Sequence, residues 1–143
     1  FVASLSSIRE FKVDRNSLEG PISVEIWQHS DLTLFSVANN IFTGSIDSSI
    51  SNASGITSLH FEGNALSGII PTEIALLPHL LEADFSGNNF SGSVPIELCR
   101  LGEQLELLVA DCGEARNGEV VELPCSCCTQ CCSSMDNNKC ISV

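Results

Sequence analysis

The chain has 143 residues, is 43% hydrophobic, and carries a formal net charge of −12 from 18 acidic and six basic residues. This length suits one domain. The acidic surplus argues against nucleic acid and anionic membranes as partners, because both attract basic surfaces. No apolar run approaches the roughly 18 residues of a membrane-spanning helix. We therefore expect one acidic domain with no membrane-spanning segment. Solubility is the simplest explanation of its negative charge.

The sequence repeats with a fixed period, most clearly from position 56 to 74 and again one period later. Asparagines form one column of equivalent positions, and Cys112 takes the fifth place in it: Asn16, Asn40, Asn64 and Asn88. Glycines form a second column: Gly20, Gly44, Gly68 and Gly92. A further column is apolar: Ile26, Ile50, Ile74 and Leu98. A fixed period of this length predicts a solenoid, in which each turn buries its apolar face by stacking on its neighbours.

Each turn carries a predicted short strand with two inward apolar residues two positions apart. These pairs are Phe11 and Val13, Phe35 and Val37, Leu59 and Phe61, Ala83 and Phe85, and Leu107 and Val109. The asparagine amide both donates and accepts, so the column is expected to satisfy backbone groups where the chain leaves each strand.

In chain order, a truncated turn at 1–3 precedes a first full turn that runs from about residue 5 to 26, with Trp27 on the convex side. We see no cap before it, and expect a mature fragment or a piece of a longer chain. In the third and fourth turns, Pro71 and Pro95 predict short convex helices. His29 and His79 are expected to be solvated on the convex side. The repeats are predicted over 1–112, and 113–143 is predicted to be a cysteine-rich cap.

The cysteine pattern favours disulfides in an oxidising compartment. The eight cysteines are Cys99, Cys112, Cys125, Cys127, Cys128, Cys131, Cys132 and Cys140. The alternative is a zinc or metallothionein-like cluster, but the paired, widely separated C-x-x-C arms of a structural zinc fold are missing. Two N-x-S sequons, at Asn52 and Asn89, agree with secretion as glycosylation sites.

The turns LHFEGNALSGIIPTEI and ADFSGNNFSGSVPIEL resemble the plant-type extracellular leucine-rich repeat, over about residues 4–112. The tail resembles the cysteine-rich ending of secreted leucine-rich repeat proteins of diatoms and related algae. The resemblance implies an α/β solenoid, a right-handed superhelix of 24-residue turns. It also implies a concave parallel β-sheet, a second sheet after the asparagine column, short convex 3-10 or α segments and a disulfide-rich C-terminal cap.

The outward positions of the strands form the predicted concave face, where solenoids commonly bind partners. The candidate ligand-binding residues are Lys12, Asp14, Ser36, His60, Glu62, Asp84 and Ser86. The same columns place Glu106, Leu108 and Ala110 outward in the fifth turn. His60 and Asp84, on neighbouring strands ~4.8 Å apart, are expected to interact as a surface pair.

Ser36, His60 and Asp84 follow one another in the order of a catalytic triad. A triad also needs hydrogen-bond contact, an oxyanion hole and a sheltering pocket, which a regular sheet does not supply. His60, Glu62 and Asp84 are the alternative ligands for a divalent ion, although solvated carboxylates are the simpler interpretation. We expect no enzyme activity, no metal and no cofactor.

Three functions remain open. The first is an extracellular, secreted or cell-surface module that binds a protein or glycan through its concave face. The second is a structural subunit of a filament or coat, in which other copies or subunits cover the N-terminal edge. The third, an inhibitor of a wall-degrading hydrolase, is implied only by the resemblance.

Overall fold

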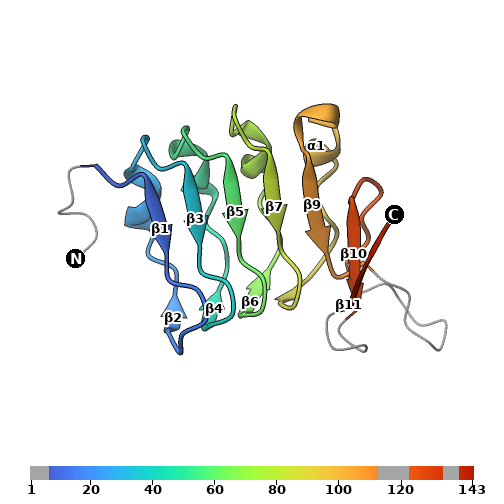
Figure 1. The fold of residues 1–143 in the computed structure, drawn as a ribbon, viewed down its shortest axis with the longest axis horizontal. Coiled ribbons are helices and arrows are strands. Elements are labelled where there is room, and N and C mark those ends of the chain that lie inside the picture. The colour runs from blue at the N-terminus through green and yellow to red at the C-terminus, as the bar shows by residue number, and fades with distance from the viewer. Residues whose placement is uncertain (1–6, 113–122, 134–138) are drawn as a thin grey trace.

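The computed structural model describes residues 7–112, 123–133 and 139–143. Its turns stack into a solenoid whose strands lie side by side from one end to the other (Figure 1). One sheet has the order β1-β3-β5-β7-β9-β10-β11, and the second has the order β2-β4-β6-β8. The predicted solenoid with a parallel sheet, short 3-10 segments and a disulfide-bonded C-terminal region is confirmed.

The first sheet keeps the predicted period through its first four strands, namely β1 (Glu10–Lys12), β3 (Leu34–Ser36), β5 (Ser58–His60) and β7 (Glu82–Asp84). Phe35 pairs with Phe11 on one side and with Leu59 on the other. Behind these strands the aromatic rings stack from turn to turn. The ring centroid of Phe61 lies 5.6 Å from that of Phe35 and 5.8 Å from that of Phe85. This row of rings forms the centre of the core.

The second sheet starts directly after the asparagine column, with β2 (Glu19–Pro21), β4 (Ile41–Gly44), β6 (Ala65–Gly68) and β8 (Asn89–Phe90). Its strands pair out of phase with the repeat, so that Glu19 lies opposite Ile41 and not opposite Thr43. The glycine in each of β2, β4 and β6 has a positive φ, 79° at Gly68, which a residue with a side chain rarely adopts. The chain thus turns sharply toward the convex side.

Short helices cover the convex side: η2 (Val24–Gln28), η3 (Ser48–Asn52), η4 (Thr72–Leu76), α1 (Ile96–Cys99) and η5 (Gly102–Gln104). Pro71 and Pro95 precede η4 and α1, as predicted. In the second turn Asp47 occupies the position of these prolines. Its carboxylate accepts a hydrogen bond from the backbone nitrogen of Ser49 at 2.9 Å, so a side-chain cap starts that helix instead.

Trp27 lies on the convex side, within η2, as predicted, whereas the prediction that His29 is solvated is wrong at one of its ring nitrogens. Trp27 is buried in the core, 1% exposed, with its ring centroid 4.7 Å from that of Phe35. His29 is not solvated at its Nε2 atom, which is buried and has no hydrogen-bond partner. His79 is exposed, as expected.

The predicted register of the fifth turn is also wrong by one residue. Ala83 of β7 pairs with Leu108 of β9 (Leu107–Ala110), whereas the repeat columns place Leu107 opposite it. The extra residue lies between Leu98 and Leu105, in the segment that contains η5. Leu108 and Ala110 therefore point into the core and are fully buried, whereas Leu107 is only half-buried.

The asparagine column ends differently from its prediction. Asp111, and not Cys112, forms the hydrogen bonds to the backbone of the preceding turn. Its carboxylate oxygens accept hydrogen bonds from the nitrogens of Gly87 (3.0 Å) and Asn88 (3.4 Å). Cys112 instead forms a disulfide with Cys131.

The C-terminal region extends the first sheet past its last turn. β10 (Gln130–Ser133) runs parallel to β9, and β11 (Lys139–Ser142) runs antiparallel to β10. Four disulfides involve all eight cysteines: Cys99–Cys127, Cys112–Cys131, Cys125–Cys128 and Cys132–Cys140. The edge of β9 is therefore paired by strands that are covalently tied to the repeats. In the described parts of the chain, helices of the length and apolar character needed to span a membrane are absent.

Candidate functional site on the concave sheet

The seven candidate residues lie on or directly after strands β1, β3, β5 and β7, on the outward face of the first sheet. In the register of the sheet, Lys12 lies opposite Ser36, Ser36 opposite His60, and His60 opposite Asp84. Strand alternation sends these side chains away from the phenylalanine row, and among them Ser36 is covered by its neighbours, 4% exposed. In the fifth turn, Val109 takes the place opposite Asp84. The predicted outward positions of Leu108 and Ala110 are thus incorrect, for the register reason given above.

At the N-terminal end of the face, charged and polar groups pair locally. The ammonium of Lys12 lies 3.1 Å from the carboxylate of Glu10 on the same strand. The hydroxyl of Ser36 donates a hydrogen bond to the carboxylate of Asp14. The charge of Lys12 is therefore balanced within β1, and the carboxylate of Asp14 is held by β3.

His60 lies between two glutamates. Its Nδ1 atom is 3.8 Å from a carboxylate oxygen of Glu62, and its Nε2 atom is 3.7 Å from one of Glu82. The predicted pair with Asp84 is not the one formed. Asp84 instead accepts hydrogen bonds from the backbone nitrogen (2.9 Å) and the hydroxyl (2.6 Å) of Ser86. The shorter aspartate side chain turns toward the backbone of Ser86, while the longer Glu82 lies near the imidazole.

The triad order of Ser36, His60 and Asp84 is not assembled into a triad. The hydroxyl of Ser36 is donated to Asp14, and the carboxylate of Asp84 is occupied by Ser86. Within the described residues, hydrogen bonds join neither Ser36 nor Asp84 to His60. The side chains are therefore arranged as a polar surface and not as a nucleophile with its base.

Glu62 is the most perturbed group on this face. Burial raises the pKa of the Glu62 carboxyl above its ordinary value, a hydrogen bond from its own backbone opposes this, and the nearby charge of Asp84 raises it further. One of its carboxylate oxygens, Oε2, is buried and has no hydrogen-bond partner. The desolvated charge of this group is costly unless a donor reaches it.

The divalent-ion alternative at His60, Glu62 and Asp84 does not fit the geometry. Throughout the described residues, three potential ligand atoms approach one another within 4.8 Å only among Cys112, Cys125 and Cys128. Those sulfurs belong to the disulfides Cys112–Cys131 and Cys125–Cys128. A disulfide sulfur carries no thiolate, so the zinc alternative would require reduction of both bonds.

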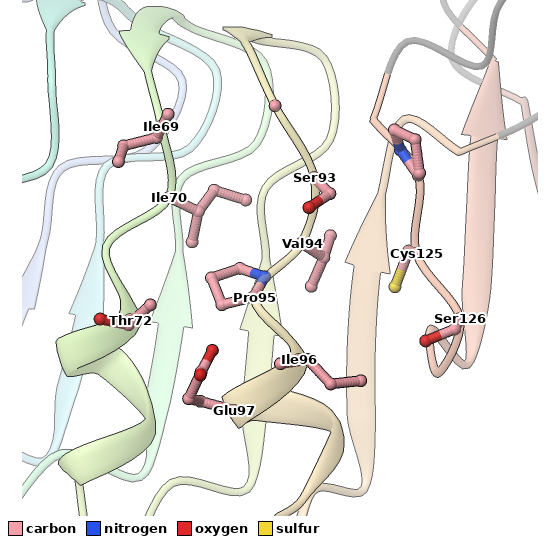
Figure 2. A pocket seen from close by; sticks show the side chains of 12 residues that line it. Ile69, Ile70, Thr72, Ser93, Val94, Pro95, Ile96, Glu97, Cys125 and Ser126 are labelled. Carbon is pink, nitrogen blue, oxygen red and sulfur yellow. The ribbon is translucent and has the colours of Figure 1, made fainter.

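A second surface feature was not predicted from the sequence. A groove of about 570 Å³ lies between the segments that follow β6 and β8 and the segment of the C-terminal region around Cys125 (Figure 2). Ile69 and Ile96 line it and are 67% and 52% exposed, unusually high for isoleucine. The only sequence signal was the pair of outward isoleucines beside Pro71 and Pro95. One wall of the groove is formed by the C-terminal region around Cys125, and the repeat pattern does not predict where that region lies.

The two sequon asparagines are both exposed. Asn52 ends η3 on the convex side, and Asn89 starts β8 at the end of the second sheet. Neither lies on the concave face.

Comparison with known proteins gives one family match and many similar folds. The Leucine Rich Repeat family model matches residues 79–101. This chain folds as a leucine-rich repeat solenoid. No curated protein sequence matched the chain.

The similar solved structures include plant receptor ectodomains. The plant peptide hormone receptor RGFR1, solved in complex with RGF2, is 32% identical with a TM-score of 0.72, over 77% of this chain and 18% of the receptor chain. The BIR2 ectodomain from Arabidopsis thaliana is 29% identical with a TM-score of 0.59, over 60% of this chain and 45% of that one.

The Arabidopsis receptor kinase HAESA, in complex with the peptide hormone IDA and the co-receptor SERK1, is similar over 99% of this chain and 24% of the receptor. Its TM-score is 0.72, and its identity of 24% supports the fold alone. This chain thus spans less than half the length of each of these three structures. Its repeats are similar to those of plant leucine-rich repeat receptor ectodomains.

Proposed function

We propose that this chain is a non-enzymatic, extracellular recognition module that binds a protein or peptide partner through its concave face. The observation that carries the proposal is the outward face of β1, β3, β5 and β7, where polar side chains stand in regular columns on a rigid sheet. Rigid sheets in solenoids make extended binding surfaces of this kind. The disulfides support an oxidising compartment. The plant peptide hormone receptor RGFR1, to which the domain is similar, was solved in complex with RGF2.

The proposal is tested with a peptide display library selected against the full chain, followed by two matched variants. Ser58→Trp places a large ring in the middle of the concave face, on β5. Ser48→Trp places the same ring on the convex side, at the start of η3. We expect the selected peptides to lose binding to Ser58→Trp and to keep binding to Ser48→Trp. Peptides that bind both variants equally would remove the concave face as the binding site.

A structural role is the second candidate, favoured by the N-terminal end of the described chain. β1 and β2 are the first strands of their sheets, and beside them lies an apolar cavity of about 60 Å³ lined by Phe11, Ile22 and Phe42 among others. A second subunit stacked on this end would extend both sheets. Sedimentation velocity of the full chain separates the two roles, since a filament subunit would assemble as its concentration rises and a receptor-type module would not.

Three finer predictions remain proposals. A glycan could replace a peptide as the concave ligand, which glycan-array binding of the same two tryptophan variants would test. Inhibition of a wall-degrading hydrolase is tested by measuring the activity of such an enzyme with and without the full chain. The resemblance of the tail to diatom and algal proteins predicts that such chains share the four disulfide pairs.

A further inference from the structure

We propose that the Cys125–Cys128 disulfide is a site of thiol–disulfide exchange, at which an external thiol transfers Cys112 from Cys131 to Cys128. The inference goes beyond concave recognition, since it concerns the C-terminal region and uses none of the residues of the concave face. Its consequence is a change in the way that strand β10 is tied to the repeats.

An external thiol reaches this disulfide at Cys125. Cys125 lines one wall of the groove of about 570 Å³ and is half-buried, whereas Cys128 is only 7% exposed (Figure 2). The exposed side chains of Ile69 and Ile96 line the same groove. The rate of attack on a disulfide depends on access to its sulfur atoms. The incoming thiolate therefore bonds to Cys125, and Cys128 leaves as the new thiolate.

The Cys128 thiolate then lies beside a second disulfide. The sulfurs of Cys112, Cys125 and Cys128 are all within 4.8 Å of one another, and Cys112 is bonded to Cys131. Exchange requires a thiolate to contact a sulfur of a disulfide. Side-chain rotation, which is far faster than disulfide rearrangement, brings the two sulfurs to that contact.

The exchange neither consumes nor releases electrons. First, the external thiolate bonds to the Cys125 sulfur and the bond between Cys125 and Cys128 breaks. Next, the Cys128 thiolate bonds to the Cys112 sulfur, and Cys131 leaves as a thiolate. Finally, the Cys131 thiolate attacks the Cys125 sulfur of the mixed disulfide and releases the external thiolate. Two new disulfides replace two old ones, so the external thiol acts as a catalyst.

The disulfide between Cys99 and Cys127 does not offer the same path. Within residues 7–112, 123–133 and 139–143, three sulfurs approach one another within 4.8 Å only in the group of Cys112, Cys125 and Cys128. Neither Cys99 nor Cys127 belongs to that group. A thiolate released from Cys127 therefore lacks the three-sulfur arrangement through which the exchange continues.

The exchange moves the covalent tie between β10 and the repeats. Cys131 lies within β10, opposite Ala110 of β9, so its bond to Cys112 fastens two paired strands together. Cys128 precedes β10. A bond from Cys112 to Cys128 thus leaves the pairing of β10 with β9 to its hydrogen bonds. We expect this end of the first sheet to open more readily after the exchange.

The test traps the released thiolate in the full chain. Cys125→Ser removes the sulfur that receives the external thiol and leaves Cys128 as a permanent thiol. We expect N-ethylmaleimide to label both Cys128 and Cys131, with at least about a tenth of the molecules labelled at Cys131, as located by tandem mass spectrometry. Cys99→Ser is the matched control. It also releases one cysteine, Cys127, which should carry the label itself.

A label confined to Cys128 would overturn the proposal, because a thiolate at this position would then leave the Cys112–Cys131 bond intact. Label spread over several cysteines to the same degree in Cys99→Ser would show unspecific rearrangement and would overturn it too. Folding of each variant is verified by the fluorescence of Trp27, the only tryptophan.

The parent chain provides a second measurement that needs no substitution. Incubation with reduced and oxidised glutathione should produce a species in which Cys112 is linked to Cys128. Amide hydrogen exchange in β10 should be at least about tenfold faster in that species than in the starting protein. If Cys112 remains bonded to Cys131 alone after this treatment, the exchange is refuted, even if the serine variant folds poorly.

Discussion

The side-chain oxygen of Asn64 accepts a hydrogen bond from the backbone nitrogen of Phe42, 22 residues earlier, at 3.0 Å. The amide of the same side chain donates to the carbonyl of Val37 in the earlier turn and to that of Phe61 in its own turn, each at 3.0 Å. One side chain therefore links the end of the concave sheet to the start of the second sheet, across two turns. Asn40 and Asn88 repeat the arrangement.

Replacing Asn64 should be costly because it leaves these buried backbone groups without partners. For Asn64→Ala we expect a loss of about 2–4 kcal/mol in the free energy of unfolding, measured by urea denaturation. Asn16→Ala is the matched control, since Asn16 is exposed and its hydrogen bonds reach only Val13 and Asp14 in its own turn. It should cost less than about 1 kcal/mol. Equal effects would mean that the link between turns contributes nothing.

Trp27 should be a major contributor to the first turn, because its ring is almost fully buried against Phe35. Trp27→Ala is expected to lower the free energy of unfolding by about 3–5 kcal/mol, followed by circular dichroism. Leu76→Ala, on exposed η4, should change it by less than about 0.5 kcal/mol. The parent chain should show blue-shifted tryptophan emission that moves to the red on unfolding; emission already at the solvated wavelength would contradict burial.

The disulfides should differ in their contribution according to the loops that they close. Cys99–Cys127 closes a sequence separation of 28 and Cys125–Cys128 one of 3. In the chain-entropy description, removal of the first pair by paired serine substitutions costs about 3.5 kcal/mol, and removal of the second about 2 kcal/mol. Urea denaturation of the two double variants compares them directly. A larger loss from the short loop would show that packing around Cys125 outweighs loop closure.

Glu62 should make the stability of the fold fall as pH rises through its titration. Its pKa is raised in the folded chain above the ordinary value of 4.5, mainly by burial, so between the unfolded and folded pKa values the folded state holds a proton that the unfolded state has lost. Glu62→Gln should therefore be more stable than the parent at pH 7 and similar to it below about pH 4. Thermal unfolding at both pH values measures this.

Asp47 is a control for which the pH dependence of stability has the opposite sign. The hydroxyl and the backbone nitrogen of Ser49 hold the pKa of the Asp47 carboxyl below its ordinary value, so its stabilisation is present above the unfolded pKa and is lost as pH falls. Asp47→Ala should lower the unfolding temperature at pH 7, and the difference should shrink in acid. The same sign of pH dependence in both variants would refute the assignment.

The exposed sequons predict glycosylation in a secretory host. Asn52 and Asn89 are both accessible, so the parent chain should carry two glycans and the Asn52→Gln and Asn89→Gln variants one each, measured by mass before and after enzymatic deglycosylation. Asn16→Gln lies outside any sequon and should leave the mass pattern unchanged. A single glycan in the parent would indicate that one site is not reached during folding.

The repeat columns predicted most of the fold because each column encodes one structural requirement. Inward apolar pairs, the asparagine ladder and the convex helices all follow the fixed period through the fourth turn. The fifth turn could not be predicted in the same way. Leu107, Leu108, Val109 and Ala110 are consecutive apolar residues, so both registers bury an apolar pair and the pattern cannot choose between them. The choice is made by the extra residue before Leu105 and by pairing with β10.

The candidate face was predicted as a set of outward positions, but its pairings were not. Sequence columns place His60 beside Asp84, yet the pairing depends on side-chain length and on which carboxylate is captured by nearby backbone. The repeat columns do not show that Glu62 would be half-buried with one carboxylate oxygen cut off from solvent. Local hydrogen bonds and burial, which emerge only when the turns stack, decide the chemistry of this face.

The step from β7 to β9 is one residue longer than each earlier step of the first sheet, and this divides the solenoid into two kinds of junction. The junctions from β1 to β7 are equivalent, so a gene duplication that inserts one whole turn among them would meet the same neighbours on both sides. A turn duplicated across the β7–β9 junction would carry the extra residue and would not match the register of the regular turns beside it. The regular turns therefore meet the disulfide-tied C-terminal end through an irregular step of the first sheet.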